Sequence, residues 1–323
     1  MSPDIERAIS ILRAAGLVAF PTETVYGLGA DARNAEAVAK IFAAKGRPPT
    51  NPLIVHVADL ETAKRYAADW NDAAQTLGAV WWPGPLTLVL PKKPEIVDGA
   101  TAGRATVALR VPDHPLALEL LREFGGPIAA PSANKSNHVS PTTAAHVREE
   151  LGDAVDLVLD GGPCSVGIES TVVDLTGDKP VILRPGGVPR RKVEAIVGPV
   201  EVFASVVDAT LPASSPGQHA KHYAPRTPAV RFETAQRGLI LPDAADGSKN
   251  GIMVLSPLVV LKKWGPIVAM PNSPELYAAN FYAVLREMDA MGLREIFIEL
   301  PPARPEWEAV RDRIIRATRP LES

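Results

Sequence analysis

The side chains best suited to chemistry lie in the segment 21–31, directly after a short apolar run at 17–20. The apolar run has the composition of a buried strand. Thr22, Thr24 and Tyr26 follow it and are succeeded by two glycines. Hydroxyl groups at a strand end, beside glycines that let the backbone approach a ligand, are typical of a small-molecule site. Threonine and tyrosine also favour strands, so ordinary packing is the alternative.

A second segment carries the charges that a phosphate group needs. Lys45 and Arg47 flank a glycine, and Asn51 and His56 follow within the next few residues. Arginine presents a planar fork to phosphate oxygens, while lysine presents a mobile point charge. The alternatives are a lysine that complements a helix C-terminus, an arginine in solvent and a buried core histidine.

Further polar motifs occur in a fixed order along the chain. They occupy residues 82–88, 110–112, 130–134, 140–142, 167–172 and 183–186. Together with the two earlier segments, this order resembles the YrdC/Sua5 family, densely over roughly the first 200 residues and more thinly to the C-terminus. Many motifs in order are more specific than one short pattern. The thinner C-terminal likeness is similar to the longer, two-domain Sua5 type.

The resemblance implies an enzyme that makes threonylcarbamoyl-adenylate and pyrophosphate from L-threonine, bicarbonate and ATP. This product is used for the t6A modification of tRNA, so the implied partners are tRNA and the downstream t6A transferase machinery. A carbamate oxygen would attack the α-phosphate, a displacement that depends on positioning and on neutralising charge. No nucleophilic side chain is needed. The implied cofactor is Mg²⁺ with ATP, held by phosphate oxygens and water, and we expect no metal site made by the protein itself.

The resemblance also implies a role for individual residues. Lys45 and Arg47 would be the catalytic cations that clamp the triphosphate. Contacts with ATP are implied for Arg47, Asn51, Thr106, Ser132, Ser140, Arg184 and Tyr223. Contacts with threonine are implied for Thr24, His56, Arg110, Ala130 and Ser170, with Ala130 offering its backbone only.

Several of these residues also have a purely structural interpretation. Arg110 would grip the threonine carboxylate, and the structural alternative is a salt bridge to Glu169 or Asp113. Ser140 precedes a proline and two threonines, which is how many helices begin. Arg184 precedes a proline and a glycine and could simply belong to a turn.

Composition restricts the class of protein. The chain has 323 residues, a net charge of −3 and 46% hydrophobic residues, which indicates a globular protein of two domains without a general nucleic-acid-binding field. Its single cysteine, Cys164, excludes an internal disulfide and a multi-cysteine zinc site. No signal peptide and no apolar run of membrane-spanning length are found, so we expect a cytoplasmic protein without a membrane partner.

The pattern of helices and strands predicts an α/β fold. Helices are expected at 4–15, from a cap at Asn34 to Gly46, at 70–80, at 115–124 and from Ser140, and later at 277–291 and 307–317. Strands are expected at 53–57, 86–90, 106–111, 128–130, 155–160, 170–174 and 181–184, and later at 238–241, 252–256, 268–270 and 295–299. We therefore predict a YrdC-like mixed twisted sheet with flanking helices, plus a smaller C-terminal Rossmann-like domain.

The predicted domains are a catalytic domain at 1–205, a linker or active-site lid at 206–228 and a C-terminal domain at 229–323. Proline, serine and glycine dominate the linker, yet it also contains two histidines, a lysine and Tyr223. By the resemblance this segment folds over the active site. The chain departs from the family at Gln218 and Ala220, where the family usually has a methionine and an aromatic residue.

Two other functions compete with the adenylate-forming transferase. An RNA-binding module would require a basic surface interleaved with aromatic residues, which the composition does not favour. An enzyme that transfers carbamoyl groups would require fused acylphosphatase-like and zinc-finger segments, and the single cysteine excludes the second of these.

Overall fold

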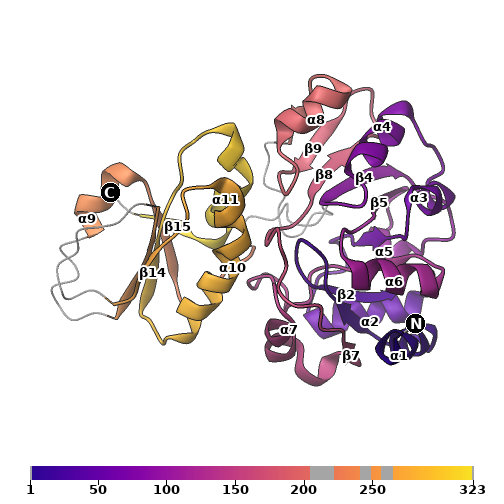
Figure 1. Cartoon of the computed structure of the whole chain (residues 1–323), viewed down its shortest axis with the longest axis horizontal. Helices are drawn as coiled ribbons and strands as arrows, with labels where there is room; N and C mark the ends of the chain where they lie inside the picture. The colour runs from indigo at the N-terminus through magenta and orange to yellow at the C-terminus, as the bar shows by residue number, and fades with distance from the viewer. Residues whose placement is uncertain (1, 204–221, 241–248, 256–264, 322–323) are drawn as a thin grey trace. The chain divides into compact units, whose positions relative to one another are not determined.

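The computed structural model describes residues 2–203, 222–240, 249–255 and 265–321 (Figure 1). The chain divides into two compact units. The described residues of unit 1 are 2–136 and 140–203, and those of unit 2 are 137–139 and everything from 222 onwards. The predicted boundary after residue 205 lies outside the described residues, as do Gln218 and Ala220. Of the predicted linker, residues 222–228 are described, and they belong to unit 2.

Unit 1 is built on a mixed, ten-stranded sheet with the order β10-β9-β8-β4-β5-β3-β6-β2-β1-β7. Its strands are β1 (Val18–Phe20), β2 (Gly27–Asp31), β3 (Ile54–His56), β4 (Leu86–Pro91), β5 (Thr106–Arg110), β6 (Ile128–Ala129), β7 (Leu157–Val158), β8 (Thr171–Asp174), β9 (Val181–Arg184) and β10 (Glu201–Val202). The pairs β3–β5 and β4–β8 are parallel, whereas β4–β5 and β8–β9 are antiparallel. The predicted mixed α/β sheet is confirmed.

The helices of unit 1 begin and end where local chemistry allows. They are α1 (Pro3–Arg13), α2 (Ala35–Lys45), α3 (Leu60–Tyr66), α4 (Asp72–Trp81), α5 (Asp98–Thr101), α6 (Pro115–Phe124), α7 (Ala144–Leu151) and α8 (Arg190–Val197), with a short 3-10 helix η1 (Gly152–Ala154). The Asn34 side chain accepts the first free N–H groups of α2, and Gly46 ends that helix with φ at 59°. Both predicted caps of α2 are confirmed.

The central strands carry the main core on one face of the sheet. Successive side chains of a strand point to opposite faces. On one face Val55, Leu88 and Leu109 join a large core that also contains buried residues of α2, α3, α4, α5, α7 and α8. This packing leaves the other face of β3, β4 and β5 available for a different kind of side chain.

The second face of the sheet is apolar at one end and polar towards the other. Helices α1 and α6 pack there over β1 and β6, around Phe20 and Ile128. Over β3, β5, β4, β8 and β9 the same face has only a small apolar cluster made of Ile54, Val89, Ala108, Val172 and Leu183. By strand alternation, this is the face on which His56, Thr87, Thr106 and Arg110 lie.

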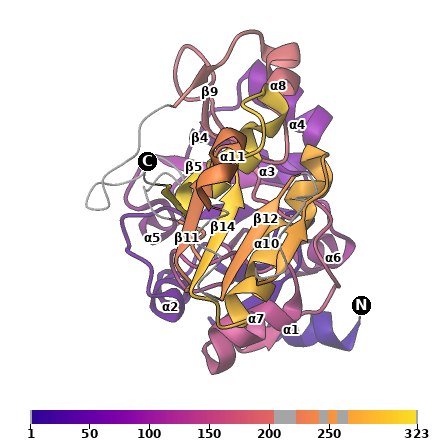
Figure 2. The same cartoon turned by 90° about the vertical axis from the view of Figure 1, so that its left-hand side faces the viewer.

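Unit 2 contains a parallel, five-stranded sheet with the order β13-β12-β14-β11-β15. Its elements are β11 (Ala229–Phe232), η2 (Thr234–Gln236), α9 (Arg237–Ile240), β12 (Asn250–Val254), β13 (Ile267–Ala269), α10 (Pro274–Ala290), β14 (Glu295–Glu299), η4 (Pro305–Trp307), α11 (Glu308–Ala317) and β15 (Arg319–Pro320). Figure 2 shows β11, β14 and β12 together with α10. Helices that link parallel strands make a Rossmann-like domain, as predicted.

Two predicted elements are wrong. The strand expected at 238–241 is instead the short helix α9, because the preceding η2 carries a capping box between Glu233 and Gln236 that starts a helical turn. The helix expected from Ser140 starts later, at Ala144, where the Thr143 hydroxyl caps it. The Ser140 hydroxyl is turned towards Glu169 instead and donates to its Oε1 at 2.6 Å.

Within the described ranges, no helix combines the length and the apolar character that crossing a membrane requires.

Candidate functional site

Arg110 is the centre of a first group of polar side chains on the second face of the sheet. It ends β5, pairs in register with His56 of β3, and is only 3% exposed. Its Nη2 lies 2.8 Å from Glu23 Oε1 and donates to Thr24 Oγ1 at 2.9 Å. Its Nε donates to the Gly84 carbonyl at 3.3 Å. We call Glu23, Thr24, His56 and Arg110 the Arg110 cluster.

The ion pair of Arg110 differs from the structural alternatives that the sequence suggested. Neither Glu169 nor Asp113 pairs with it; the partner is Glu23, whose second oxygen accepts the Asp113 backbone N–H at 3.0 Å. Nη1 of Arg110 makes no hydrogen bond to any residue that the structure describes. The guanidinium is thus held along one edge, with a donor left for an anion.

The segment before β2 is a bend that the Thr22 side chain closes. The Thr22 hydroxyl accepts the N–H groups of Thr24 and Val25 and donates to the Val25 carbonyl at 2.6 Å. A threonine side chain can close a turn in this way. As a result, Thr24 meets Arg110, whereas the Tyr26 hydroxyl donates to the Gly162 carbonyl at 2.8 Å.

His56 is neutral in this environment. Burial, and then the charge of Arg110, lower the pKa of its imidazole to about 3. Its Nδ1 is buried and makes no hydrogen bond to any described residue. A buried nitrogen without a partner usually marks a place for a water molecule or a ligand group. The His56 side chain therefore suits contact with an uncharged or hydrogen-bonding part of a ligand.

The low pKa of His56 predicts how stability depends on pH. The unfolded chain binds a proton near pH 6.5 and the folded chain does not, so stability is lost as the pH falls from 6.5 towards 3. We expect the free energy of unfolding to fall by about 2–3 kcal/mol more in the wild type than in His56→Gln between pH 6.5 and 4.5. Denaturant titrations at several pH values measure this difference, and parallel curves for the two proteins would contradict it.

Ser170 is the centre of a second group, which we call the Ser170 cluster, with Thr87 and Arg184. The hydroxyls of Thr87 and Ser170 are 2.8 Å apart. Arg184 Nη2 donates to the Ser170 carbonyl at 2.9 Å and to its Oγ at 3.1 Å. Thr87 lies in β4, Ser170 directly precedes β8 and Arg184 ends β9, so the neighbouring strands bring the predicted Ser170 and Arg184 together.

The turn after β9 lies in close contact with the backbone of residues 169–171. A Cβ atom at Gly186 would lie 2.4 Å from the carbonyl oxygen of Glu169, from Ser170 C and from Thr171 N. All three are backbone atoms, which cannot move without shifting a strand. Glycine is therefore required where this turn passes the site.

We expect Gly186→Ala to lower the free energy of unfolding by about 2–4 kcal/mol, because the methyl group forces the two backbones apart. The matched control is Gly177→Ala, whose added Cβ meets only the Lys179 carbonyl at 4.0 Å. Its effect should stay within about 0.5 kcal/mol. Denaturant titration of both variants measures the difference, and equal stabilities would show that the turn can relax.

Lys45 is the centre of a third group at the end of α2. Its ammonium donates to the carbonyls of Ser132 and Asn134 and, at 3.4 Å, to the Asn134 side chain. Burial, and then the nearby charge of Arg47, hold the pKa of Lys45 well below its usual value. An anion placed beside Lys45 would oppose both effects. We call Lys45, Arg47, Asn51, Ser132 and Asn134 the Lys45 cluster.

Arg47 and Asn51 shape the loop that leads into β3. Arg47 donates from Nε to the Asn51 carbonyl at 3.1 Å and from Nη2 to the Pro52 carbonyl at 2.9 Å. Asn51 is 2% exposed, and its Oδ1 makes no hydrogen bond to any described residue. A buried acceptor without a partner is costly, so Asn51 Oδ1 is a strong candidate for contact with a donor on a ligand.

Other predicted residues lie near these groups. Thr106 begins β5 and shares a face with Arg110, four residues on. Ala130 follows β6 and donates its N–H to the Ile54 carbonyl at 2.8 Å, so its backbone donor is already engaged. The Ser140 hydroxyl is bonded to Glu169. Tyr223 belongs to unit 2, where it is buried with the Arg313 guanidinium 5.0 Å from its ring centroid.

The structure brings together residues that are far apart in sequence. The backbone joins the Arg110 and Lys45 clusters, since Leu28 N–H donates to the Pro131 carbonyl and Ala133 N–H to the Tyr26 carbonyl. All four predicted cations of unit 1 are buried, with exposed fractions between 2% and 6%. They are Lys45, Arg47, Arg110 and Arg184.

Sequence reasoning gave no role to Asn134 or Thr87 and did not foresee the partner of Glu23. Asn134 binds Lys45, Thr87 binds Ser170, and Glu23 pairs with Arg110. Asn134 and Thr87 lie inside motifs already singled out, and their polar side chains were the available signal. Glu23 sits beside Thr24 but had no identifiable partner before the strands were paired.

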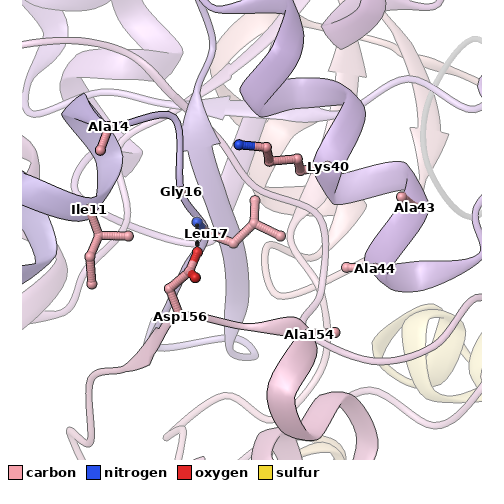
Figure 3. A pocket seen from close by; sticks show the side chains of 9 residues that line it. All are labelled: Ile11, Ala14, Gly16, Leu17, Lys40, Ala43, Ala44, Ala154 and Asp156. Atoms are coloured by element: carbon pink, nitrogen blue, oxygen red, sulfur yellow. Dashed lines mark hydrogen bonds between the residues drawn. The ribbon is translucent and has the colours of Figure 1, made fainter.

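A cavity of about 530 Å³ lies elsewhere in unit 1, between α1, α2 and the start of β1 (Figure 3). Its lining is mostly alanine and aliphatic, and none of the residues of the three clusters contributes to it. Its charged groups are engaged: Lys40 Nζ donates to the Ala15 carbonyl, and Asp156 accepts the Leu17 N–H at 2.7 Å. Nothing in this lining suggests chemistry.

Among the described residues, no group of three or more histidine, cysteine or acidic side chains is arranged to hold a metal ion.

Two family models match the chain one after the other. The Sua5/YciO/YrdC model, described as "Telomere recombination", matches residues 10–186. A second model, described as the C-terminal domain of threonylcarbamoyl-AMP synthase, matches residues 188–318.

Proteins from a bacterium and an archaeon resemble the chain over nearly its whole length. A threonylcarbamoyl-AMP synthase of Bacillus subtilis is 41% identical, with 98% of this chain and 93% of that protein covered. A protein of the same name from Pyrococcus abyssi is 38% identical, with 97% and 94% covered. The crystal structure of P. abyssi Sua5 complexed with L-threonine superposes with a TM-score of 0.91 and 38% identity, covering 98% of this chain and 96% of that one.

Proposed function

This chain belongs to the Sua5/YciO/YrdC family, and we infer that it is a threonylcarbamoyl-AMP synthase. It makes threonylcarbamoyl-AMP, pyrophosphate and water from L-threonine, bicarbonate and ATP, the water being released when bicarbonate carboxylates the threonine amine. The relatives of the same name, similar over both units, support this function. In reaction class the enzyme is a nucleotidyltransferase, since an adenylyl group is transferred to a carbamate oxygen.

The observation that carries the proposal is the Arg110 cluster. A buried guanidinium whose Nη1 donors are not used, beside a threonine hydroxyl and a neutral histidine, suits the carboxylate and the hydroxyl of a small amino acid. The P. abyssi relative is crystallised with L-threonine, which agrees with this ligand class. We assign threonine contacts to Thr24, His56, Arg110 and Ser170, and to the backbone around Ala130.

We assign to the Lys45 cluster the positive charge that the attack of the carbamate on ATP requires. The threonine carbamate attacks the α-phosphate of ATP, and pyrophosphate leaves with its charge neutralised by cations. Lys45 and Arg47 are the cations placed for this, and the Asn51 acceptor can receive a donor of the nucleotide. ATP enters as its magnesium complex, whose ion is bound by phosphate oxygens and water.

The remaining ATP contacts complete the assignment. We assign ATP contacts to Thr106, Ser132, Ser140 and Arg184 in unit 1 and to Tyr223 in unit 2. Because the product is a reactive mixed anhydride, an acceptor must take it up soon after release. That acceptor is the t6A transferase machinery acting on tRNA.

Pyrophosphate release tests the function directly. Purified protein with MgATP should release pyrophosphate only when both L-threonine and bicarbonate are present. Omission of either substrate should return the rate to background, because no carbamate can then form. Release that is independent of threonine would refute the assignment.

A further inference from the structure

Glu23 occupies a position in the Arg110 cluster that the assignments above do not use. Its side chain is 5% exposed, and its Oε1 lies 2.8 Å from Arg110 Nη2. Its Oε2 accepts the Asp113 N–H at 3.0 Å, and its carbonyl accepts the Val166 N–H at 2.7 Å. The carboxylate is thus fixed at both ends, without freedom to turn away from the site.

Oε1 is a buried acceptor with unused capacity. It makes no hydrogen bond to any described residue, although it is close to Arg110, because the N–H bonds of Nη2 do not point at it. The Nη2 donor is directed at Thr24 Oγ1 instead. A carboxylate oxygen out of water without a hydrogen bond is strongly unfavourable, so a donor from a ligand is expected there.

The charges of the cluster cancel. Arg110 contributes one positive charge and Glu23 one negative charge, while His56 is neutral because burial depresses its pKa to about 3. A ligand with a net charge would leave this buried pair unbalanced. A zwitterion would not, since its two charges meet opposite partners.

An α-amino acid has the matching geometry. Its ammonium and carboxylate are attached to the same carbon, so an ammonium lies next to wherever the carboxylate binds. A carboxylate on the open edge of Arg110 therefore brings the ammonium towards an acceptor beside Nη2, which is Glu23 Oε1. We propose that Glu23 binds the ammonium group of the amino-acid substrate and thereby selects zwitterionic α-amino acids over carboxylic acids without an amine.

This inference rests on the proposed function, because it takes the Arg110 cluster as the amino-acid site. It adds a specificity-determining residue to that site. Glu169, the other buried carboxylate in the motif segments, accepts the Ser140 hydroxyl at 2.6 Å and is not among the partners of Arg110. Glu23 is therefore the carboxylate that is placed for the ammonium.

The test compares two ligands that differ only in the amine. L-Threonine and (R)-3-hydroxybutyrate share the carboxylate, the hydroxyl and the methyl group, and calorimetry or displacement measures both dissociation constants. Glu23→Gln keeps the size of the side chain and its acceptor for Asp113 N–H but removes the charge. We expect the preference for threonine over hydroxybutyrate to fall by about 10- to 100-fold in this variant.

Hydroxybutyrate should bind the variant as well as or better than the wild type, because Arg110 loses its internal counter-charge. The matched control is Glu299→Gln, which removes a buried, arginine-paired carboxylate in unit 2 and should leave the preference unchanged. An equal loss for both ligands in Glu23→Gln would show that Glu23 only supports Arg110, and the proposal would fall.

The wild type provides a second measurement that does not depend on the folding of a variant. It should bind threonine at least about 10-fold more tightly than (R)-3-hydroxybutyrate. Equal affinities would overturn the inference while threonine-dependent pyrophosphate release still upheld the enzyme function. If the protein released no pyrophosphate in response to threonine, the proposed function itself would be refuted.

Discussion

Arg110→Ala should raise the threonine concentration needed for half-maximal pyrophosphate release by about 100-fold or more. The substitution removes the buried guanidinium that we assign to the substrate carboxylate and leaves Glu23 as an uncompensated negative charge in the same place. Both effects oppose the binding of an anion. The requirement for ATP should change by less than about threefold, because the Lys45 cluster is untouched. Steady-state kinetics with each substrate varied in turn measure the two effects.

Two further variants separate the loss of the carboxylate contact from damage to the fold. Arg110→Lys retains the charge opposite Glu23 but lacks the planar fork, so it should restore stability more than threonine use. Arg190→Ala removes a partly exposed arginine of α8 and should leave both substrate requirements unchanged. If Arg110→Ala raised the requirements for threonine and ATP equally, the carboxylate assignment would be rejected.

Much of unit 1 could be predicted because residues within or next to each helix and strand indicate where it begins and ends. Asn34 and Gly46 mark the two ends of α2, and Pro115 marks the first residue of α6. Apolar runs such as 86–90 and 181–184 became strands at nearly the predicted bounds. In each case the signal lies within a few residues, so neighbours in sequence were enough to read it.

The errors arose where a distant partner or a neighbouring turn decided the outcome. Ser140 has every local feature of a helix cap, yet Glu169 takes its hydroxyl and the helix starts at Ala144. The segment 238–241 is apolar enough for a strand, but a capping box upstream makes it helical. Local propensity is a weak guide when a tertiary contact or a neighbouring turn competes with it.

The site was predictable in its residue types but not in its pairings. Motif order identified Arg110, Ser170 and Arg184 as candidates, whereas their contacts with Glu23 and Thr87 depend on how β4, β5 and β8 adjoin in the sheet. Strand order is a long-range property that no single segment of the sequence encodes. This is why the suggested salt bridges of Arg110 to Glu169 or Asp113 were wrong: its partner in the structure is Glu23.

Arg47→Ala should have the opposite pattern to Arg110→Ala. We expect the ATP concentration for half-maximal rate to rise by about 30- to 100-fold, because a buried cation that we assign to the triphosphate is lost and the Asn51 loop loses two hydrogen bonds. The requirement for threonine should change far less. Titration of ATP at saturating threonine and bicarbonate measures the first effect, and the reverse titration measures the second.

The interpretation of Arg47→Ala depends on a control from the same helix region. Lys40→Ala removes a partly exposed cation that is paired with Glu36, and it should leave ATP use unchanged. If ATP use depended only on the overall positive charge of this region, both substitutions would weaken it. If Arg47 contacts the phosphates directly, only Arg47→Ala would weaken it. Unchanged ATP use in Arg47→Ala would remove Arg47 from the clamp. We would then assign the neutralisation of the leaving pyrophosphate to Lys45, whose lowered pKa a neighbouring phosphate anion would raise.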